Sequence, residues 1–198
     1  MNISFCSGVQ IYMNKEGIHL PSPDPRHPYP GDGRYRFPDI EGLNLLGDRV
    51  SLPTVIPGSF HLMLCVFQPE SLYMMKEWLP FCDDLHKQYR HTPAPVDYSM
   101  VLVLPPPPIE GDVPAFTQAL GDVSDFYVKT GSVISYHDQA FVRRRLSLHK
   151  KAASAVVLLD GHGNIIWKDD GEFTTARAEH LKVILETLAP LAPRTRLQ

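Results

Sequence analysis

The stretch FQPESLYMMKEWLPF, residues 67–81, decides the fold of this chain. It follows FHLMLCVF, residues 60–67, an unbroken apolar run with the length of a strand that is buried on both faces. From residue 70 to residue 91, apolar residues recur at intervals of three and four, which predicts a helix with one buried stripe. Pro80 lies inside this helix and is expected to kink it, because the proline ring displaces the hydrogen bond to the carbonyl of Lys76.

The remaining elements predict a mixed sheet with helices on both faces. Short strands or turns are expected in residues 37–58, a second buried strand at YSMVLVL (98–104) and a short helix near residues 113–120. Asp138 is the expected N-cap of a helix in HDQAFVRRRLSLHKK (137–151). SAVVLLDGHGNIIW (154–167) predicts a β-hairpin, and TTARAEHLKVILETLAPLAP (174–193) predicts an amphipathic helix that Pro190 ends. This order of elements predicts an α/β fold.

Length and composition predict one globular domain. The chain has 198 residues, of which 43% are hydrophobic and 21% charged, which is enough for a substantial core. Proline is concentrated near the start, so residues 1–36 are expected to be an extended N-terminal segment. The domain is then expected to occupy residues 37–191, followed by a short tail at 192–198.

Charge and cysteine content restrict the possible functions. A net charge of −3 predicts no general affinity for nucleic acid, which is expected only if the chain lies within a ribosome. No apolar run approaches the roughly 20 residues that a membrane span needs. The first fifteen residues have neither an apolar signal core nor an arginine, so targeting stays open. The three cysteines, Cys6, Cys65 and Cys82, form no C-x-x-C pair, which fits a reducing compartment.

The central stretch resembles thioredoxins. Members of that family place an aromatic residue at the end of the central strand and a proline in the helix that follows, and Phe67 and Pro80 match both features. In this register the two redox cysteine positions fall on Leu72 and Met75. The family also has a cis-proline just before the hairpin, whereas HKKAASAVV (149–157) contains no proline. The resemblance implies a thioredoxin-like, three-layer α/β/α fold without redox chemistry.

Residues 37–188 also resemble a narrower group, the mitochondrial ATP synthase assembly-factor family, which chaperones membrane-sector subunit a (subunit 6). The resemblance rests on EWLPF, with Trp78 and Phe81, and on the hairpin and last helix; there the matching residues are Asp160, Ile165, Trp167, Gly171 and Glu179. The family usually has a basic residue where this chain has Ile166. The resemblance implies a non-enzymatic chaperone without a cofactor, in the mitochondrial matrix or peripheral to the inner membrane.

Two alternatives from other classes stay open. The chain could be an accessory subunit of a large mitochondrial complex, such as the ATP synthase, a respiratory complex or the mitoribosome. It could also be a peroxiredoxin-like enzyme that uses Cys65 or Cys82. A catalytic cysteine needs a cationic neighbour or a helix N-terminus to lower its pKa. Cys65 lies inside a predicted strand and Cys82 deep in a predicted helix, so we expect buried, inert thiols.

Metal-binding and carboxylate motifs are weak. Cys82 and His86 are spaced like two ligands on one helical face, and His91 follows, but zinc usually takes three or four protein ligands. No metal site is therefore predicted. Asp160, Asp169 and Asp170 flank the hairpin at turn positions, where Asp commonly bonds the local backbone, and we assign them no chemistry.

Two groups of residues are candidates for partner binding. Met74 and Trp78 do not both fit the buried helical stripe, so part of this apolar group is expected at the surface, where it would suit a protein client. The second group is a basic run, comprising Arg143, Arg144, Arg145, Lys150 and Lys151. This run either complements the dipole of its helix or docks an acidic partner, an anionic membrane or RNA phosphates.

Overall fold

The computed structural model describes residues 2–4, 10–14, 17–19, 36–53, 59–106, 116, 118, 131–169 and 172–189. The chain divides into two compact units, Met1–Tyr35 and Arg36–Gln198. The first unit contains a small antiparallel sheet of β1 (Asn2–Ser4), β2 (Gln10–Asn14) and β3 (Gly17–His19), which the sequence did not predict. The tail predicted for residues 192–198 lies outside the described residues, so that boundary stays a prediction.

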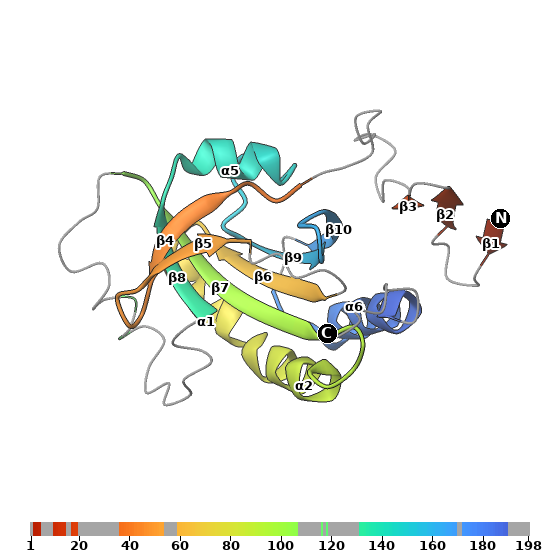
Figure 1. The fold of residues 1–198 in the computed structure, drawn as a ribbon. Helices are drawn as coiled ribbons and strands as arrows, with labels where there is room; N and C mark the ends of the chain where they lie inside the picture. Colours follow the sequence, from red (N-terminus) through yellow and green to blue (C-terminus); the bar gives the residue numbers. More distant parts are fainter. Residues whose placement is uncertain are drawn as a thin grey trace. The chain divides into compact units, whose positions relative to one another are not determined.

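The second unit is built on a seven-stranded mixed sheet (Figure 1). Its strand order is β10-β9-β6-β7-β8-β4-β5. The bounds are β4 (Ile40–Asn44), β5 (Arg49–Leu52), β6 (Phe60–Val66), β7 (Val96–Leu104), β8 (Ser132–Tyr136), β9 (Ser154–Asp160) and β10 (Ile165–Asp169). The central strands β6, β7 and β8 run parallel, and the other neighbouring pairs run antiparallel.

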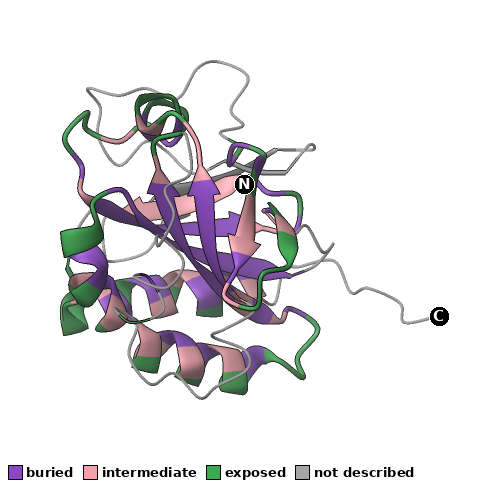
Figure 2. Ribbon diagram, turned by 90° about the vertical axis from the view of Figure 1, so that its left-hand side faces the viewer, coloured by how far each residue is buried: buried purple, intermediate pink, exposed green. Residues whose placement is uncertain are grey.

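Helices cover both faces of this sheet, as the sequence predicted. On one face lie the short 3-10 turn η1 (Pro69–Ser71) and the helices α1 (Leu72–Lys76), α2 (Leu79–Tyr89) and α6 (Thr175–Leu188). The helix α5 (Gln139–Arg145) packs on the other face through Val142. Every residue of β6 is buried, since its side chains alternate between the two helical layers (Figure 2). The three-layer α/β/α prediction is confirmed.

The helix predicted for residues 70–91 is two helices rather than one kinked helix. α1 ends at Lys76, and α2 begins at Leu79 with Pro80 in its first turn. Proline is tolerated there, because the first N–H groups of a helix have no partner within the helix. At the junction the amide of Trp78 donates to the carbonyl of Met75 over 3.1 Å.

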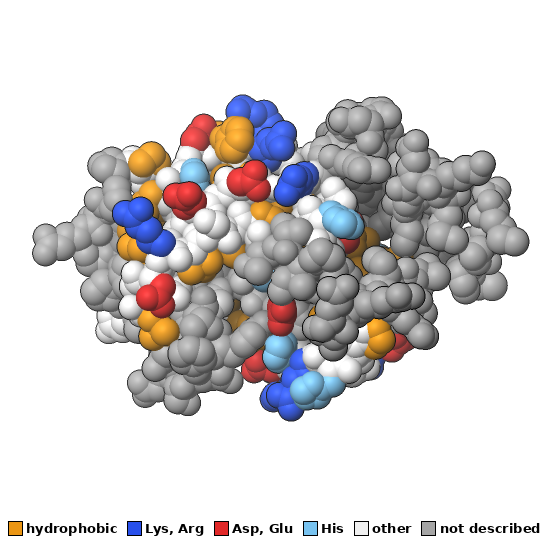
Figure 3. Space-filling view, viewed as in Figure 1, with side chains coloured by type: hydrophobic (Ala, Val, Ile, Leu, Met, Phe, Trp, Pro, Cys, Tyr) orange, Lys and Arg blue, Asp and Glu red, His pale blue; other side chains and the backbone are white. Residues whose placement is uncertain are grey.

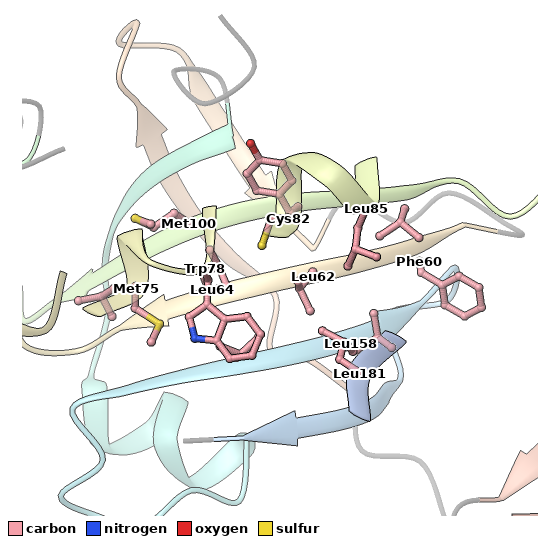
Figure 4. Close-up of a cluster of buried hydrophobic side chains, with 14 of the residues drawn as sticks. Phe60, Leu62, Leu64, Met75, Trp78, Cys82, Leu85, Met100, Leu158 and Leu181 are labelled. Atoms are coloured by element: carbon pink, nitrogen blue, oxygen red, sulfur yellow. The ribbon is translucent and has the colours of Figure 1, made fainter. Parts of the chain in front are cut away.

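The core beneath α1, α2 and α6 joins distant parts of the chain (Figure 4). Cys82 and Leu85 of α2 and Leu181 of α6 belong to one buried cluster with Leu62 of β6 and Leu158 of β9. Burying each large apolar side chain stabilises the fold by about 1.5–3 kcal/mol. The amphipathic helix predicted at the C-terminal end is confirmed as α6, and its N-cap Thr174 accepts a hydrogen bond from the amide of Arg177.

The predicted hairpin is confirmed as β9 and β10. Its turn is organised by Asp160, whose Oδ1 accepts hydrogen bonds from the amides of His162, at 2.8 Å, and Asn164, at 2.9 Å. Gly163 has a φ of 80°, a conformation that side chains with a Cβ rarely adopt. The predicted helix near residues 113–120 lies outside the described residues, apart from residues 116 and 118.

Candidate functional site

The candidate site is the carboxyl end of β6, where the chain passes through Phe67 and η1 into α1. In open α/β sheets this is the edge at which ligands and reacting groups gather. The two positions that the sequence register aligns with redox cysteines are buried: Leu72 is 3% exposed and Met75 is 0% exposed. Both side chains belong to the core under α1 and α2. Apolar groups in this setting supply neither a nucleophile nor a ligand for a metal.

The two described cysteines lie elsewhere and are buried. Burial raises the pKa of the Cys65 thiol to about 12. It also raises the pKa of Cys82 far above its usual range, with the charge of Asp83 adding to the shift. The thiolate is the reactive form of cysteine, so both groups are held in their unreactive state. Cys65 of β6 belongs to the core beneath α5, whereas Cys82 of α2 belongs to the core on the other face of the sheet, so the two cannot act as a pair.

The segment before β9, where thioredoxins have their cis-proline, is attached here by backbone hydrogen bonds. The carbonyl of Ala153 accepts from the amides of Phe67, at 2.9 Å, and Gln68, at 3.3 Å. Within the described ranges the cis peptide bond is Leu52–Pro53, at the far edge of the sheet. The loop that leads into β9 therefore lies against the first residues of η1 without a cis-proline.

The prediction that Trp78 contributes to a partner-binding surface is wrong, because its side chain is fully buried. Trp78 lies three positions after Met75 and four before Cys82, on the buried side, where its indole makes edge contacts with Phe81 (6.1 Å between ring centroids) and Phe173 (5.2 Å). Met74 is half-buried, and the exposed apolar side chain of α1 is Tyr73, at 66%. The exposure of Tyr73 could have been predicted from helical spacing, because this residue lies outside the buried stripe that contains Leu72 and Met75.

The prediction that Arg143 belongs to a docking patch is also wrong. Arg143 is only 9% exposed, and its guanidinium lies over the ring of Phe67, 4.5 Å from the centroid. Its Nε donates to the carbonyl of Ala152 over 2.9 Å. The other members of the basic run are exposed, namely Arg144, Arg145, Lys150 and Lys151. The structure thus separates one structural arginine from four solvent-facing cations.

Cys82 and His86, which have the spacing of two metal ligands, do not come together. Cys82 is buried, and Nδ1 of His86 lies 3.1 Å from Oδ1 of Asp97 and 3.1 Å from the carbonyl of Val96. Because its ring faces these oxygens, His86 ties α2 to the start of β7 instead of pairing with Cys82. Within the described ranges, no group of three His, Cys, Asp or Glu side chains is placed to hold a metal ion.

The residues of the assembly-factor motif lie around the hairpin and α6. Phe81 packs on Trp78, and Ile165 packs on the core beneath α5. Trp167 meets His180 of α6 edge-on, with 6.3 Å between ring centroids. Glu179 is exposed, and Gly171 lies outside the described residues, as does Asp170. Asp169 forms an ion pair with Arg177 over 3.2 Å. These positions join the hairpin to the helices.

A buried polar pair was missed by the sequence analysis. His61 lies within the apolar run of β6, and its Nε2 is 3.0 Å from Oγ of Ser99 on β7. Burial lowers the pKa of His61 to about 4, against the opposing charge of Asp97, so the imidazole is neutral at physiological pH. His61 is 8% exposed, which leaves it without access to a substrate. The hydrogen bond satisfies a polar group inside the sheet.

Comparison with known proteins identifies the fold but no family. No protein-family model and no curated protein sequence matches the chain. Similar solved structures include an exposed lipoprotein thioredoxin from Streptococcus pneumoniae, which is 13% identical with a TM-score of 0.50 and covers 76% of this chain and 100% of that one. An uncharacterized conserved protein from Geobacillus kaustophilus is 13% identical with a TM-score of 0.52, and the match covers 82% and 85% of the two chains.

A thiol:disulfide interchange protein from Bacteroides sp. is 17% identical with a TM-score of 0.50. It covers 79% of this chain and 90% of its own. Identities this low show the fold alone. The chain therefore has a thioredoxin-like fold, as predicted. In the part of the chain that the structure describes, no helix is long and apolar enough to span a bilayer.

Proposed function

We propose that this chain is a redox-inactive, thioredoxin-like protein that acts by binding other proteins rather than by catalysis. One observation carries the proposal: both redox positions hold core side chains, Leu72 and Met75. The inert settings of Cys65 and Cys82 support it, because neither thiol is accessible or ionised. A thioredoxin-like fold that lacks redox cysteines still presents a rigid surface, and such a surface is sufficient for binding another protein.

Tyr73 is the proposed centre of the client-binding surface, together with Met74. The Tyr73 side chain is 66% exposed on α1, one position after the former redox residue Leu72. Tyrosine is enriched in protein interfaces, because its ring is apolar and its hydroxyl can hydrogen-bond. Methionine beside it offers an adaptable apolar contact.

The finer proposal is that the client is the membrane-sector subunit a of the mitochondrial ATP synthase, and that the chain acts as its assembly chaperone. Support comes from the residue matches at Trp78, Phe81, Asp160, Ile165 and Trp167. In the fold, Trp78 packs on Phe81 at the start of α2, Trp167 meets α6, and Asp160 organises the hairpin turn. Ile165 packs on the core beneath α5. These contacts would maintain the shape that presents α1.

A quantitative pull-down tests both levels of this proposal. The tagged chain is recovered from mitochondria in mild detergent, and its partners are measured by mass spectrometry. We expect subunit a at low stoichiometry without the complete complex, and loss of most of this recovery in Tyr73→Ala. The matched control is Val183→Ala, which removes an exposed apolar side chain from α6 and is expected to change nothing.

Other outcomes of the pull-down would contradict the proposal at different levels. Recovery of an entire complex at a one-to-one ratio would make the chain an accessory structural subunit, and the chaperone role would fall. Recovery of other clients through Tyr73 would retain the binding role and remove the ATP synthase assignment. Equal recovery by the Tyr73→Ala and Val183→Ala variants would refute the proposed surface.

A further inference from the structure

The exposed part of the basic run forms a surface with an aromatic side chain in it. α5 buries Val142, and Leu146 follows one turn later in the same core. The opposite side of the helix carries Phe141, which is 41% exposed, with Arg144 and Arg145 three and four positions further on. Residues at these spacings share one helical face. The sequence analysis missed this aromatic residue because it considered only the charged positions.

The turn after α5 carries two more exposed cations close to the end of the helix. The amide of Leu148 donates to the carbonyl of Arg143 over 2.9 Å, and Nε of Arg143 donates to the carbonyl of Ala152. Both ends of this turn are therefore attached to the last turn of α5, with the exposed Lys150 and Lys151 between them. The space-filling view shows basic side chains beside a hydrophobic one over α5, with acidic side chains next to them (Figure 3).

The charge of this surface is opposite to that of the whole chain. Residues 139–152 contain no Asp or Glu, although the net charge of the protein is −3. The nearest acidic residue in the sequence, Asp138, accepts a hydrogen bond from the amide of Ala140 as the N-cap of α5. At the other end, Nζ of Lys168 donates to the carbonyls of Leu146 and Ser147. This ammonium offsets the negative end of the helix dipole, which would otherwise repel an anion.

We infer that the surface formed by Phe141, Arg144, Arg145, Lys150 and Lys151 binds an anionic lipid membrane. Peripheral membrane helices combine Lys and Arg side chains with Trp, Phe or Leu side chains, and this surface offers both kinds of group. The cations attract anionic headgroups, and the ring inserts among them. Single-stranded RNA would instead need several stacking rings, whereas this surface has Phe141 alone among its described residues.

The inference goes beyond the proposed function and uses a different face of the sheet. α5 lies on the face opposite α1 and α2, so a membrane and a client could be bound at the same time. The membrane test below contains no client protein. Its failure would leave the client proposal standing, and failure of the pull-down would leave the membrane inference standing.

Vesicle co-sedimentation of the full chain tests the inference. The probes are neutral phosphatidylcholine vesicles and vesicles in which about a third of the lipid is anionic. We expect binding to the anionic vesicles alone, weakened when salt is raised to about 0.5 M. Arg144→Gln/Arg145→Gln should weaken partitioning about thirtyfold, since each cation near an anionic surface contributes roughly a factor of five. Phe141→Ser should weaken it about tenfold.

Matched variants separate charge from folding. Lys87→Gln/Arg90→Gln removes the same charge from exposed positions at the C-terminal end of α2, on the other face of the sheet, and should change partitioning less than twofold. Arg144→Lys/Arg145→Lys keeps the charge and should retain binding. Equal binding to neutral and anionic vesicles, or equal losses in the α5 and α2 variants, would overturn the inference. Binding to a glutamate-rich peptide but not to vesicles would also overturn it, in favour of an acidic protein.

Discussion

At the scale of single residues, the fold determines the charge state of His61. The side chain is enclosed in β6, bonds Ser99 and has a pKa lowered from 6.5 to about 4 by burial. The unfolded chain therefore binds more protons than the folded chain between these two values. The contribution of neutral His61 to the free energy of unfolding is fully present above pH 6.5 and is lost as the pH falls toward 4.

The lowered pKa of His61 predicts a measurable loss of stability in acid. Between pH 7 and pH 4, His61 should remove about 3 kcal/mol from the free energy of unfolding, as a shift of this size implies. Urea unfolding of the wild type and of His61→Gln at several pH values isolates this contribution, because the other titrating groups are common to both. The variant should show a shallower loss of stability in acid. Identical pH slopes for the two proteins would contradict the buried, neutral imidazole.

The same scale shows where local sequence reasoning fails. The stripe of Leu72 and Met75 follows from helical spacing, and both residues are buried as expected. Trp78 was assigned partly to the surface because it and Met74 do not both fit this stripe. Trp78 in fact lies three positions after Met75 and four before Cys82, so the helical spacing itself places it among the buried residues. Arg143 was misassigned for another reason, since the aromatic ring that receives it belongs to Phe67, 76 positions earlier.

At the scale of elements, Arg143 connects α5, the carboxyl end of β6 and the loop before β9. Its contact with Phe67 and its hydrogen bond to Ala152 join three segments. Arg143→Met should therefore lower the free energy of unfolding by about 1–3 kcal/mol, through loss of the cation–π contact and of the bond to a buried carbonyl. Arg144→Met, at the exposed neighbouring position, should remain within about 0.5 kcal/mol of the wild type.

Chemical denaturation of the two variants measures this difference. Both substitutions remove one positive charge from adjacent positions, so a change in net charge cannot account for a difference between them. Equal losses of stability would mean that Arg143 is as dispensable as its neighbour, and that the loop is held by other contacts. A larger effect of Arg144→Met would contradict the assignment of the two residues to the inner and outer sides of α5.

Local patterns predicted most elements of the sheet and its helices. β6, β7, the β9–β10 hairpin and α6 were all predicted from apolar runs, turn residues or helical spacing, and all are present. The helix predicted in residues 137–151 begins after Asp138 as expected but ends at Arg145, because Ser147 takes a φ of 50° and a turn follows. β4 and β5 were expected only as short strands or turns, because β4 joins the sheet through β8, which is far away in the sequence. β8 itself was not predicted.

At the scale of the whole molecule, order and spacing together identified the thioredoxin-like arrangement, and the similar solved structures share it. The function is less accessible to such reasoning, because a fold accommodates many activities. The features that bear on function are the burial of Leu72 and Met75 and the burial of the thiols of Cys65 and Cys82. The exposed groups that remain, Tyr73 on one face and the α5 surface on the other, are suited to binding.

The central claim is that the thioredoxin-like frame is kept here without its chemistry, and a turnover assay tests it most directly. The folded chain with Cys6→Ser is supplied with dithiothreitol and either a disulfide substrate or hydrogen peroxide, and the rate is compared with a variant that also carries Cys65→Ser/Cys82→Ser. We predict equal rates for the two proteins, both at the uncatalysed background. Turnover above background that disappears in the second variant would contradict the account and make the chain a thiol enzyme.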